Sequence, residues 1–241
     1  MKVGVSGALG RMGTLTCEAV ESVPDLDLAA RFAPGQGLDD RGPMLACDVI
    51  IEFSPPAAVM DNLAAWRESG AQVVVGTSGF DATRLEELEG LWAGSETSCL
   101  VVPNFSLGAV VMMWLAEKAA PYFTAAEVIE LHHDRKADAP SGTAIATAER
   151  MRPAGSRAVE SSELLPGARG AEIEEVWVHS VRLPGLLAHQ EVLLGNQGEI
   201  LTLRHDTTDR TAFVPGILIA IRTVSGLPPG VSVGLEQLLG L

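Results

Sequence analysis

The first part of the chain alternates between short apolar runs and longer segments of helical composition. Strand-like runs, rich in Val, Ile and Leu, occur at 2–6, 26–32, 48–53, 72–75 and 99–102. Segments of helical composition separate them, at 11–22, 55–69 and 81–92. Strands separated by helical crossovers are typical of βαβ units, which build a parallel, doubly wound sheet. The pattern therefore predicts an α/β fold for this part of the chain.

The pattern changes after residue 105. Helical composition recurs at about 106–120, 141–152 and 210–223. Strand-like runs occur at 127–132, 174–183, 189–194 and 199–205. The stretch 152–170 is rich in Pro, Gly and Ser and is predicted to be a mobile loop. Because the later strands are joined by short Gly-containing segments, we expect a mostly antiparallel mixed sheet here.

The composition is that of a globular protein. Apolar residues make up 47% and charged residues 20% of the 241 positions, which excludes disorder over most of the length. The formal net charge of −14 makes nucleic acid an unexpected partner, because an acidic surface repels phosphate backbones. The longest apolar runs, 107–116 and 212–221, are too short to span a bilayer, so no membrane segment is expected.

The cysteines and the first residues suggest a compartment. Cys17, Cys47 and Cys99 are odd in number and form no CxxC pair. We expect them to be buried apolar side chains in a reducing environment, not disulfides or metal ligands. The chain opens directly in a strand-like run, so no signal peptide is predicted. A cytoplasmic protein is expected.

A glycine-rich loop follows the first strand and precedes a helix. Gly7, Gly10 and Gly13 form the pattern G-x-x-G-x-x-G. In such a loop the glycines permit a tight turn, close approach to a pyrophosphate and close helix packing, and the helix N-terminus attracts the anion. This context favours dinucleotide binding over a purely structural turn. The candidate cofactor-binding residues of the loop are Gly7, Ala8, Leu9, Gly10, Arg11 and Met12.

The end of the second strand lacks the carboxylate that commonly binds the ribose 2′-hydroxyl of a dinucleotide. Arg31 lies there instead, and it either meets a 2′-phosphate, which would favour NADPH, or points into solvent. Two later loops follow strands at the sheet edge where open α/β folds bind ligands. They supply the further candidates Gly76, Thr77, Ser78, Val102, Pro103, Asn104 and Phe105.

We therefore expect two domains. Residues 1–105 plus 215–241 form an N-terminal Rossmann-type, doubly wound, dinucleotide-binding domain. Residues 106–214 form a second α+β domain on a mostly antiparallel mixed sheet, for substrate binding and oligomerisation.

Basic residues gather at the end of the strand predicted at 127–132. His132, His133, Arg135 and Lys136 lie within five residues of one another in an otherwise acidic chain. Lys136 provides a movable ammonium and His133 a further donor, while His132 suits proton transfer. A metal site or a purely structural basic loop are the alternatives, but no further cluster of metal ligands accompanies these histidines, so no metal is expected.

A helix start follows this cluster. Ser141 is a plausible N-cap, and Gly142 and Thr143 form the first turn, where N–H groups can bind an external anion. We therefore expect a receptor for a compact molecule that carries carboxylates.

The stretch 127–144 matches E-x-x-E-x-H-x-x-x-K-x-D-x-P-S-G-T-A at every fixed position. In these residues the chain resembles the 4-hydroxy-tetrahydrodipicolinate (dihydrodipicolinate) reductase family of lysine and diaminopimelate biosynthesis, in particular its actinobacterial members. The glycine loop, the 76–80 and 103–105 loops and the late segment 205–213 agree in order, so the resemblance covers essentially the whole chain.

The resemblance implies hydride transfer from NADH or NADPH to C4 of a cyclic, unsaturated imine dicarboxylate, in a homotetramer. By this resemblance His132 is the acid/base residue and Lys136 the proton donor and substrate clamp. His133, Ser141, Gly142 and Thr143 would hold the substrate carboxylates. Actinobacterial relatives carry an acidic residue in place of Ala33 and a basic one in place of Leu9, and Ser78 replaces the more usual Thr, so the choice between NADH and NADPH stays open.

Two other functions are compatible with the fold. One is a Rossmann dehydrogenase that acts on an amino-acid semialdehyde or imine, although no cysteine lies in a convincing polar loop. The other is a nucleotide-sensing binding protein that has lost catalysis, which the presence of both His132 and Lys136 disfavours.

Overall fold

The structure is a computed structural model that describes residues 1–151 and 162–241, so part of the loop predicted at 152–170 lies outside the described residues. The chain divides into two compact units. The first contains Met1–Phe105 and Phe213–Leu241, and the second contains Ser106–Ala212. The second unit is therefore an insertion within the first.

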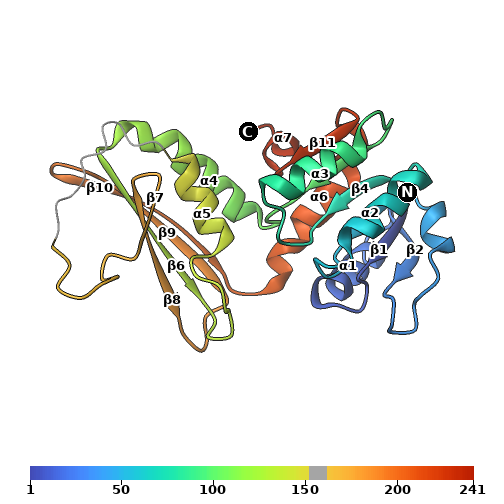
Figure 1. Cartoon of the computed structure of the whole chain (residues 1–241), viewed down its shortest axis with the longest axis horizontal. Coiled ribbons are helices and arrows are strands. Elements are labelled where there is room, and N and C mark those ends of the chain that lie inside the picture. Colours follow the sequence, from blue (N-terminus) through green and yellow to red (C-terminus); the bar gives the residue numbers. More distant parts are fainter. Residues whose placement is uncertain (152–161) are drawn as a thin grey trace. The chain divides into compact units, whose positions relative to one another are not determined.

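The first unit is built on one parallel sheet of six strands in the order β11-β5-β4-β3-β1-β2 (Figure 1). Its strands are β1 (Lys2–Ser6), β2 (Asp27–Phe32), β3 (Val49–Glu52), β4 (Gln72–Val75), β5 (Ser98–Val101) and β11 (Gly230–Val233). Chain order reverses at β1, with β2 on one side and β3 on the other, which is the switch point of a doubly wound sheet. The predicted α/β fold is confirmed.

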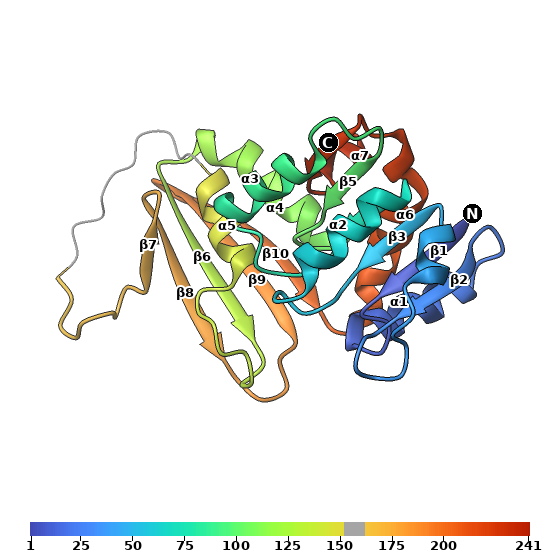
Figure 2. The same ribbon diagram turned by 45° about the vertical axis from the view of Figure 1, so that its right-hand side comes forward.

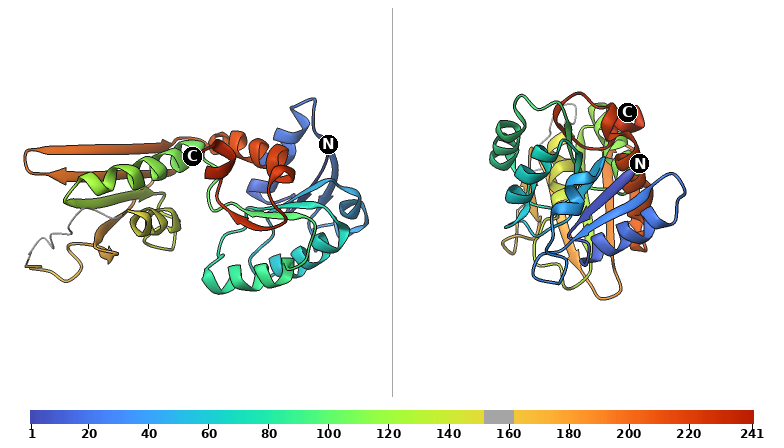
Figure 3. Two further views of the ribbon diagram at one scale, coloured as in Figure 1. Left: turned by 90° about the horizontal axis from the view of Figure 1, so that it is seen from above. Right: turned by 90° about the vertical axis from the view of Figure 1, so that its right-hand side faces the viewer.

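Helices cover both faces of this sheet, as Figure 3 shows. The helices of the first unit are α1 (Arg11–Glu21), α2 (Val59–Ser69), α3 (Ala82–Trp92), α6 (Val214–Thr223) and α7 (Glu236–Leu239), with 3-10 turns at 42–46 and 224–226. A further 3-10 turn at 210–213 lies where the chain passes from the second unit back to the first. Helices α2 and α3 pack on one face through Leu63, Trp66, Leu88 and Trp92, which are at most 1% exposed. Helices α1 and α6 lie on the other face and contact each other. The central strands read as continuous apolar runs because both of their faces are buried.

The second unit has a five-stranded mixed sheet in the order β10-β9-β6-β8-β7 (Figure 2). Its elements are α4 (Leu107–Ala119), a 3-10 turn at 120–122, β6 (Ala125–His132), α5 (Gly142–Arg150), β7 (Ala171–Ile173), β8 (Val176–Arg182), β9 (Ala188–Asn196) and β10 (Glu199–Thr207). Among the described strands of this second sheet only the β6–β8 pair is parallel, so the predicted mostly antiparallel mixed sheet is confirmed.

Helices α4 and α5 lie on the same face of this second sheet (Figure 2). Small residues of both helices, among them Ala116 and Ala148, pack against Val128, Val178 and Val192 of the sheet. Along β6 the buried positions alternate, as expected for a strand with one covered face. None of the helices in the described ranges has the length and apolar character that a bilayer crossing requires.

Three details differ from the sequence-based expectation. The strand expected from residue 174 begins at Val176, because Glu174 and Glu175 form a tight turn with φ of 47° and 67° and link β7 to β8. The strand β11 was not expected, and it extends the first sheet beside β5. The helix expected from residue 55 begins at Val59, after a turn that contains Pro55.

Candidate active site

The glycine loop connects β1 to α1 at the switch point of the first sheet. Gly7 has φ of 73°, and a Cβ there would lie 2.6 Å from the carbonyl oxygen of Phe53. A Cβ on Gly13 would lie 2.1 Å from the carbonyl oxygen of Gly7, so the helix rests directly on the loop backbone. Both positions therefore require glycine, for backbone conformation and close approach respectively.

The N-terminus of α1 carries no side-chain cap. Gly10 is extended at the N-cap position, and Arg11 and Met12 begin the helix. The amides of Gly7 and Ala8 both donate to the carbonyl of Phe32, which fixes the loop to β2. An uncapped helix start with its dipole directed at a glycine loop is suited to an anion such as the pyrophosphate of a dinucleotide. Leu9 lies on this loop with 49% of its surface exposed.

The end of β2 is organised differently from the sequence-based expectation. The Arg31 guanidinium forms an ion pair with Glu21 on α1, with 44% of the arginine side chain exposed. Ala33 is buried, and its amide donates to the carbonyl of Leu38. The structure thus gives Arg31 a protein partner, and any 2′-phosphate at this position would compete with Glu21 for the guanidinium.

A second arginine, which the sequence analysis did not select, lies at the same end of the sheet. Arg41 stacks over the rings of Phe32 and Trp66, with its guanidinium carbon 5.4 and 5.9 Å from their centroids. One of its nitrogens donates to the side chain of Asn62 at 3.0 Å. Only its contacts reveal it, because no motif surrounds it in the sequence.

The loops after β4 and β5 are held together by their strands. Val102 donates its amide to the carbonyl of Val75, which places Gly76 beside the segment 102–105. A Cβ on Gly76 would lie 2.1 Å from the ring of Phe53, and the rings of Phe53 and Phe105 are 5.7 Å apart. This glycine therefore leaves room for two aromatic rings at the sheet edge.

The remaining candidates of these loops lie at the same edge. The buried Thr77 hydroxyl donates to the carbonyls of Glu52 and Ser54, so it holds the loops after β3 and β4 together. Ser78 and Pro103 are exposed, and Asn104 is half-buried. The glycine loop, the 76–78 loop and the 102–105 loop thus all follow strands of the first sheet, where they would line a dinucleotide.

The three cysteines are free thiols, and the expectation that they are buried is confirmed. Burial raises the pKa of each thiol, so none is an activated nucleophile. In the described part of the chain, no group of three His, Cys, Asp or Glu side chains is arranged to hold a metal ion.

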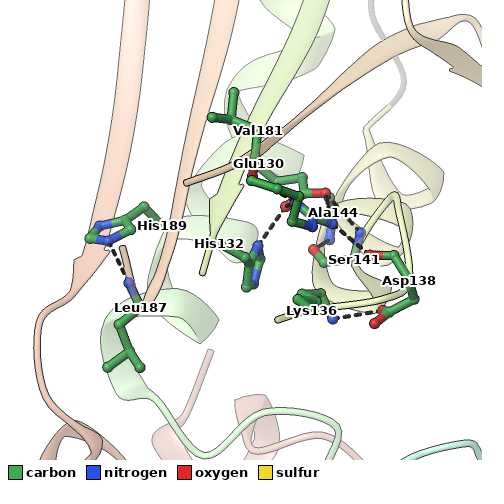
Figure 4. Close-up of polar contacts among 10 residues, drawn as sticks. Glu130, His132, Lys136, Asp138, Ser141, Ala144, Val181, Leu187 and His189 are labelled. Carbon is green, nitrogen blue, oxygen red and sulfur yellow. Dashed lines mark hydrogen bonds and ion pairs between the residues drawn. The ribbon is translucent and has the colours of Figure 1, made fainter. Parts of the chain in front are cut away.

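In the second unit, the site residues gather where β6 ends at His132 (Figure 4). The Nδ1 atom of His132 lies 2.5 Å from Oε2 of Glu130, whose side chain is fully buried. Arg182 at the end of β8 donates to both Glu130 oxygens, at 2.8 and 2.9 Å. The parallel register that pairs His132 with Arg182 brings these groups together.

The Glu130 carboxylate is ionised at neutral pH. Burial alone would raise its pKa, but the hydrogen bonds from His132 and Arg182 outweigh burial and lower the pKa to about 2. The amide of Ser141 also donates to Glu130, at 3.2 Å. A single carboxylate therefore joins β6, β8 and the start of α5.

The start of α5 has the predicted cap. Ser141 is extended, and its hydroxyl accepts a hydrogen bond from the amide of Ala144 at 3.2 Å. Gly142 and Thr143 form the first turn, where a helix start directs its backbone N–H groups out of the helix. Together with the helix dipole, this turn suits a carboxylate ligand.

Lys136 and His133 lie on the loop between β6 and α5. The ammonium of Lys136 is 2.6 Å from Asp138, and this contact lowers the pKa of the Asp138 carboxyl. The Nδ1 atom of His133 is buried and has no hydrogen-bond partner within residues 1–151 and 162–241. A buried polar atom without a partner is costly, and a polar ligand would satisfy it.

The first unit has a doubly wound sheet whose glycine loop leads into an uncapped helix. The second unit gathers a histidine, a lysine and a helix start around a buried carboxylate. This combination defines a dinucleotide-dependent oxidoreductase. Comparison with known proteins specifies the family. The family model "Dihydrodipicolinate reductase, N-terminus" matches residues 1–105, and "Dihydrodipicolinate reductase, C-terminus" matches residues 108–239. The chain belongs to the dihydrodipicolinate reductase family.

Individual relatives agree over the full length. The chain is 48% identical to the 4-hydroxy-tetrahydrodipicolinate reductase of Nocardia farcinica, covering 100% of this chain and 99% of the relative. It is 50% identical to the enzyme of the same name from Thermobifida fusca, covering 100% of both. Among solved structures, a dipicolinate-bound dihydrodipicolinate reductase from Paenisporosarcina sp. TG-14 superposes with a TM-score of 0.84 at 33% identity, covering 98% of each chain. The resemblance stated from the sequence is confirmed.

Proposed function

We propose that this chain reduces 4-hydroxy-tetrahydrodipicolinate to tetrahydrodipicolinate, with NADH or NADPH, in lysine and diaminopimelate biosynthesis. The observation that carries the proposal is the cluster at the end of β6, where His132, Lys136 and the first turn of α5 surround one loop. Such a cluster combines proton donors with an anion site, which a cyclic dicarboxylate requires.

The overall reaction adds a hydride and a proton to the substrate and removes its 4-hydroxyl group as water. A reduced nicotinamide, when bound, supplies the hydride to ring C4. The residues of the glycine loop and of the 76–78 and 102–105 loops would hold that cofactor in the first unit, where the positions of Gly7 and Gly13 leave room only for backbone. The glycine positions and the three loops do not set a preference between NADH and NADPH.

Substrate binding is assigned to the second unit. The amides of Gly142 and Thr143, at the start of α5, would bind one carboxylate, with Ser141 holding that turn in place. The partnerless Nδ1 of His133 supports a second polar contact. Lys136 would exchange its contact with Asp138 for the substrate.

Proton delivery completes the reaction after electron density has moved onto the ring system. Lys136 is assigned as the proton donor, because its ammonium lies on the same loop as the carboxylate-binding turn. His132 is assigned as the acid/base residue, with Glu130 on its Nδ1 side. General acid catalysis by such positioned groups contributes roughly 10²–10⁴-fold.

A homotetramer is part of the same proposal. The face of the second sheet opposite α4 and α5 carries the half-buried apolar residues Ile129, Leu131, Val181 and Leu193. A second copy of the chain is the expected occupant, because an apolar sheet face on one copy complements the same face on another. Analytical ultracentrifugation should give the mass of four chains, and a monomer at micromolar concentration would contradict this assignment.

The activity is tested by following the oxidation of NADH and of NADPH with enzymatically generated cyclic substrate. We expect oxidation that depends on both substrate and enzyme, and the ratio of kcat/KM values for the two cofactors gives the preference. Cofactor binding without any turnover would indicate a nucleotide-sensing protein instead. Turnover of an amino-acid semialdehyde in preference to the cyclic compound would also overturn the proposal.

A further inference from the structure

The buried carboxylate of Glu130 interrupts the apolar face of β6. Its neighbours on this face, Ala126 and Val128, belong to the core, whereas Glu130 is fully buried and charged. A buried charge is costly unless it is paired and fully hydrogen-bonded. The proposed roles of His132 and Lys136 do not by themselves require a carboxylate at this position.

The hydrogen bonds around Glu130 determine where the proton of His132 lies. An ionised carboxylate only accepts hydrogen bonds, so the nitrogen that faces it must carry a hydrogen. That nitrogen is Nδ1 of His132, at 2.5 Å from Oε2. The other ring nitrogen, Nε2, is then the atom that can accept or donate a further proton.

Resting on the proposed function, we propose that Glu130 is the positioning residue of His132: with Arg182 as its counter-ion, it fixes the Nδ1–H form of the ring, so that His132 exchanges protons with the substrate through Nε2. Neither Glu130 nor Arg182 needs to touch the substrate for this role. Both act through the orientation and the proton content of a neighbouring ring.

Glu130 also couples the ring to the substrate-binding turn. Its Oε1 accepts from the amide of Ser141, at the N-cap of α5. Arg182 donates in addition to the carbonyl of Asp138 at 2.6 Å, on the loop that carries Lys136. The carboxylate and its counter-ion thus hold the acid/base ring, the lysine loop and the carboxylate-binding turn in one arrangement.

The variant Glu130→Gln tests the proton assignment, because the glutamine amide has one accepting and one donating end. Oε1 of Glu130 accepts from the Ser141 amide and from Arg182, while Oε2 accepts from His132 and Arg182. An NH2 group in place of Oε1 would oppose two donors, one of them a fixed backbone amide. An NH2 group in place of Oε2 would oppose only the obligate donor Arg182, because the histidine can change tautomer and the Ser180 hydroxyl, which also bonds this carboxylate, can turn to accept. We therefore expect the NH2 group to face Nδ1 and to move the ring proton to Nε2.

The expected result for Glu130→Gln is a fall in kcat of about 10- to 100-fold, which is the range found when the carboxylate that orients a metal-bound histidine is replaced. The dissociation constant for NADH should stay within about twofold, because the glycine loop lies in the other unit and gains no contact. Nitrogen-15 NMR of the His132 ring should report Nδ1–H as the neutral form in the unmodified enzyme and Nε2–H in the variant.

Glu117→Gln is the matched control. Glu117 lies on α4 of the same unit and accepts from Lys118 and Arg150, in the same kind of three-residue cluster. None of these three residues belongs to the groups assigned to the cofactor, the substrate or the contact between subunits. We expect the kcat of Glu117→Gln to stay within about twofold of the unmodified enzyme.

Several results would overturn the assignment. They are a neutral His132 with its proton on Nε2 in the unmodified enzyme, an unchanged kcat in Glu130→Gln, or a rise in KM with kcat unchanged. The spectrum of the unmodified enzyme decides the question even if the variant does not fold. If the unmodified enzyme reduces no cyclic substrate, the proposed function fails, whereas the spectrum still tests the position of the ring proton.

Discussion

Lys136 holds its ammonium 2.6 Å from the carboxylate of Asp138, with 21% of the lysine side chain exposed. This contact is at the surface, because 64% of the Asp138 side chain is exposed, so it contributes little to stability. A substrate carboxylate can replace Asp138 at small cost for the same reason. At the scale of residues, Lys136 is therefore available to the substrate although it is already paired.

Lys136→Ala should abolish measurable turnover, because the variant loses both the proton donor and a substrate contact. The dissociation constants for NADH and NADPH should change by less than about twofold, since the residue lies outside the nucleotide-binding unit. Lys118→Ala is the control, because Lys118 pairs with Glu117 in the same unit. Turnover in Lys136→Ala equal to that of the control would remove the residue from the mechanism.

The low pKa of Glu130 predicts a pH dependence of folding. The carboxyl has a pKa of about 2 in the folded chain against a reference value of 4.5, so the unfolded chain binds more protons between these values. The ionised Glu130 carboxylate, bonded to its partners, contributes about 3 kcal/mol to the free energy of unfolding. This contribution is fully present above pH 4.5 and is lost as pH falls towards 2. Urea unfolding of the unmodified chain and Glu130→Gln should therefore give stabilities that converge as the solution becomes acidic. A difference that stays constant from pH 7 to pH 3.5 would contradict this.

At the scale of elements, the contact between α1 and the glycine loop sets the geometry of the predicted pyrophosphate site. The helix begins without a side-chain cap, so its first amides depend on water or a ligand for hydrogen bonds. Gly13 brings this helix start onto the carbonyl of Gly7. Any side chain at this position must move the helix or the loop.

Gly13→Ala should weaken NADH and NADPH binding by at least about tenfold and destabilise the fold, because its Cβ would lie 2.1 Å from the Gly7 oxygen. Gly90→Ala is the control, since Gly90 lies inside α3 with open space around a Cβ. That change should stabilise the chain by about 0.5–1 kcal/mol without altering cofactor affinity. Equal cofactor affinities in the two variants would refute the assigned contact.

The turn between β7 and β8 carries avoidable strain. Glu174 and Glu175 both adopt positive φ, which suits Asn and Gly in a two-residue hairpin. Replacing the pair with Asn-Gly should raise the free energy of unfolding by roughly 1 kcal/mol, which thermal unfolding would detect. The turnover number should stay the same. A lower melting temperature would indicate that the glutamates make stabilising contacts.

The elements that the sequence predicted well are those specified by local signals. The glycine loop, the Ser141 cap and the end of β6 at His132 each depend on residues within a few positions. The Glu174–Glu175 turn was missed because neither residue type usually signals a turn. β11 was missed because it has four half-buried or exposed residues and depends on pairing with β5, far away in the sequence.

The candidate site was predictable in part for the same reason. The basic cluster and the helix start are contiguous in sequence, so His132, Lys136 and Ser141 could be selected together. The counter-ion of Glu130 could not, because Arg182 is 52 positions away and is brought close only by the parallel register of β6 and β8. Arg41 was missed because stacking on two rings leaves no mark in the sequence.

At the scale of the whole molecule, the chain leaves the first unit after Phe105 and returns to it at Phe213. The 48–50% identity to 4-hydroxy-tetrahydrodipicolinate reductases extends over the full chain, so it covers the inserted unit and both segments that connect it to the first unit. The loops proposed to bind the cofactor and the cluster proposed to bind the substrate thus belong to separate compact units of one chain. In the full chain the two proposed sites can be tested separately, by cofactor binding for the first unit and by the NMR signal of His132 for the second.

The insertion also orders events on the ribosome. Because α6, β11 and α7 are made last, the nucleotide-binding sheet must wait for more than 100 further residues before its remaining helices and edge strand arrive. The inserted unit, by contrast, leaves the ribosome as one uninterrupted segment. Since compact units fold as they emerge, the second unit completes its folding before the first. Until α6 is made, the sheet face that it will cover stays apolar and exposed, and this is the surface that a nascent-chain chaperone would shield.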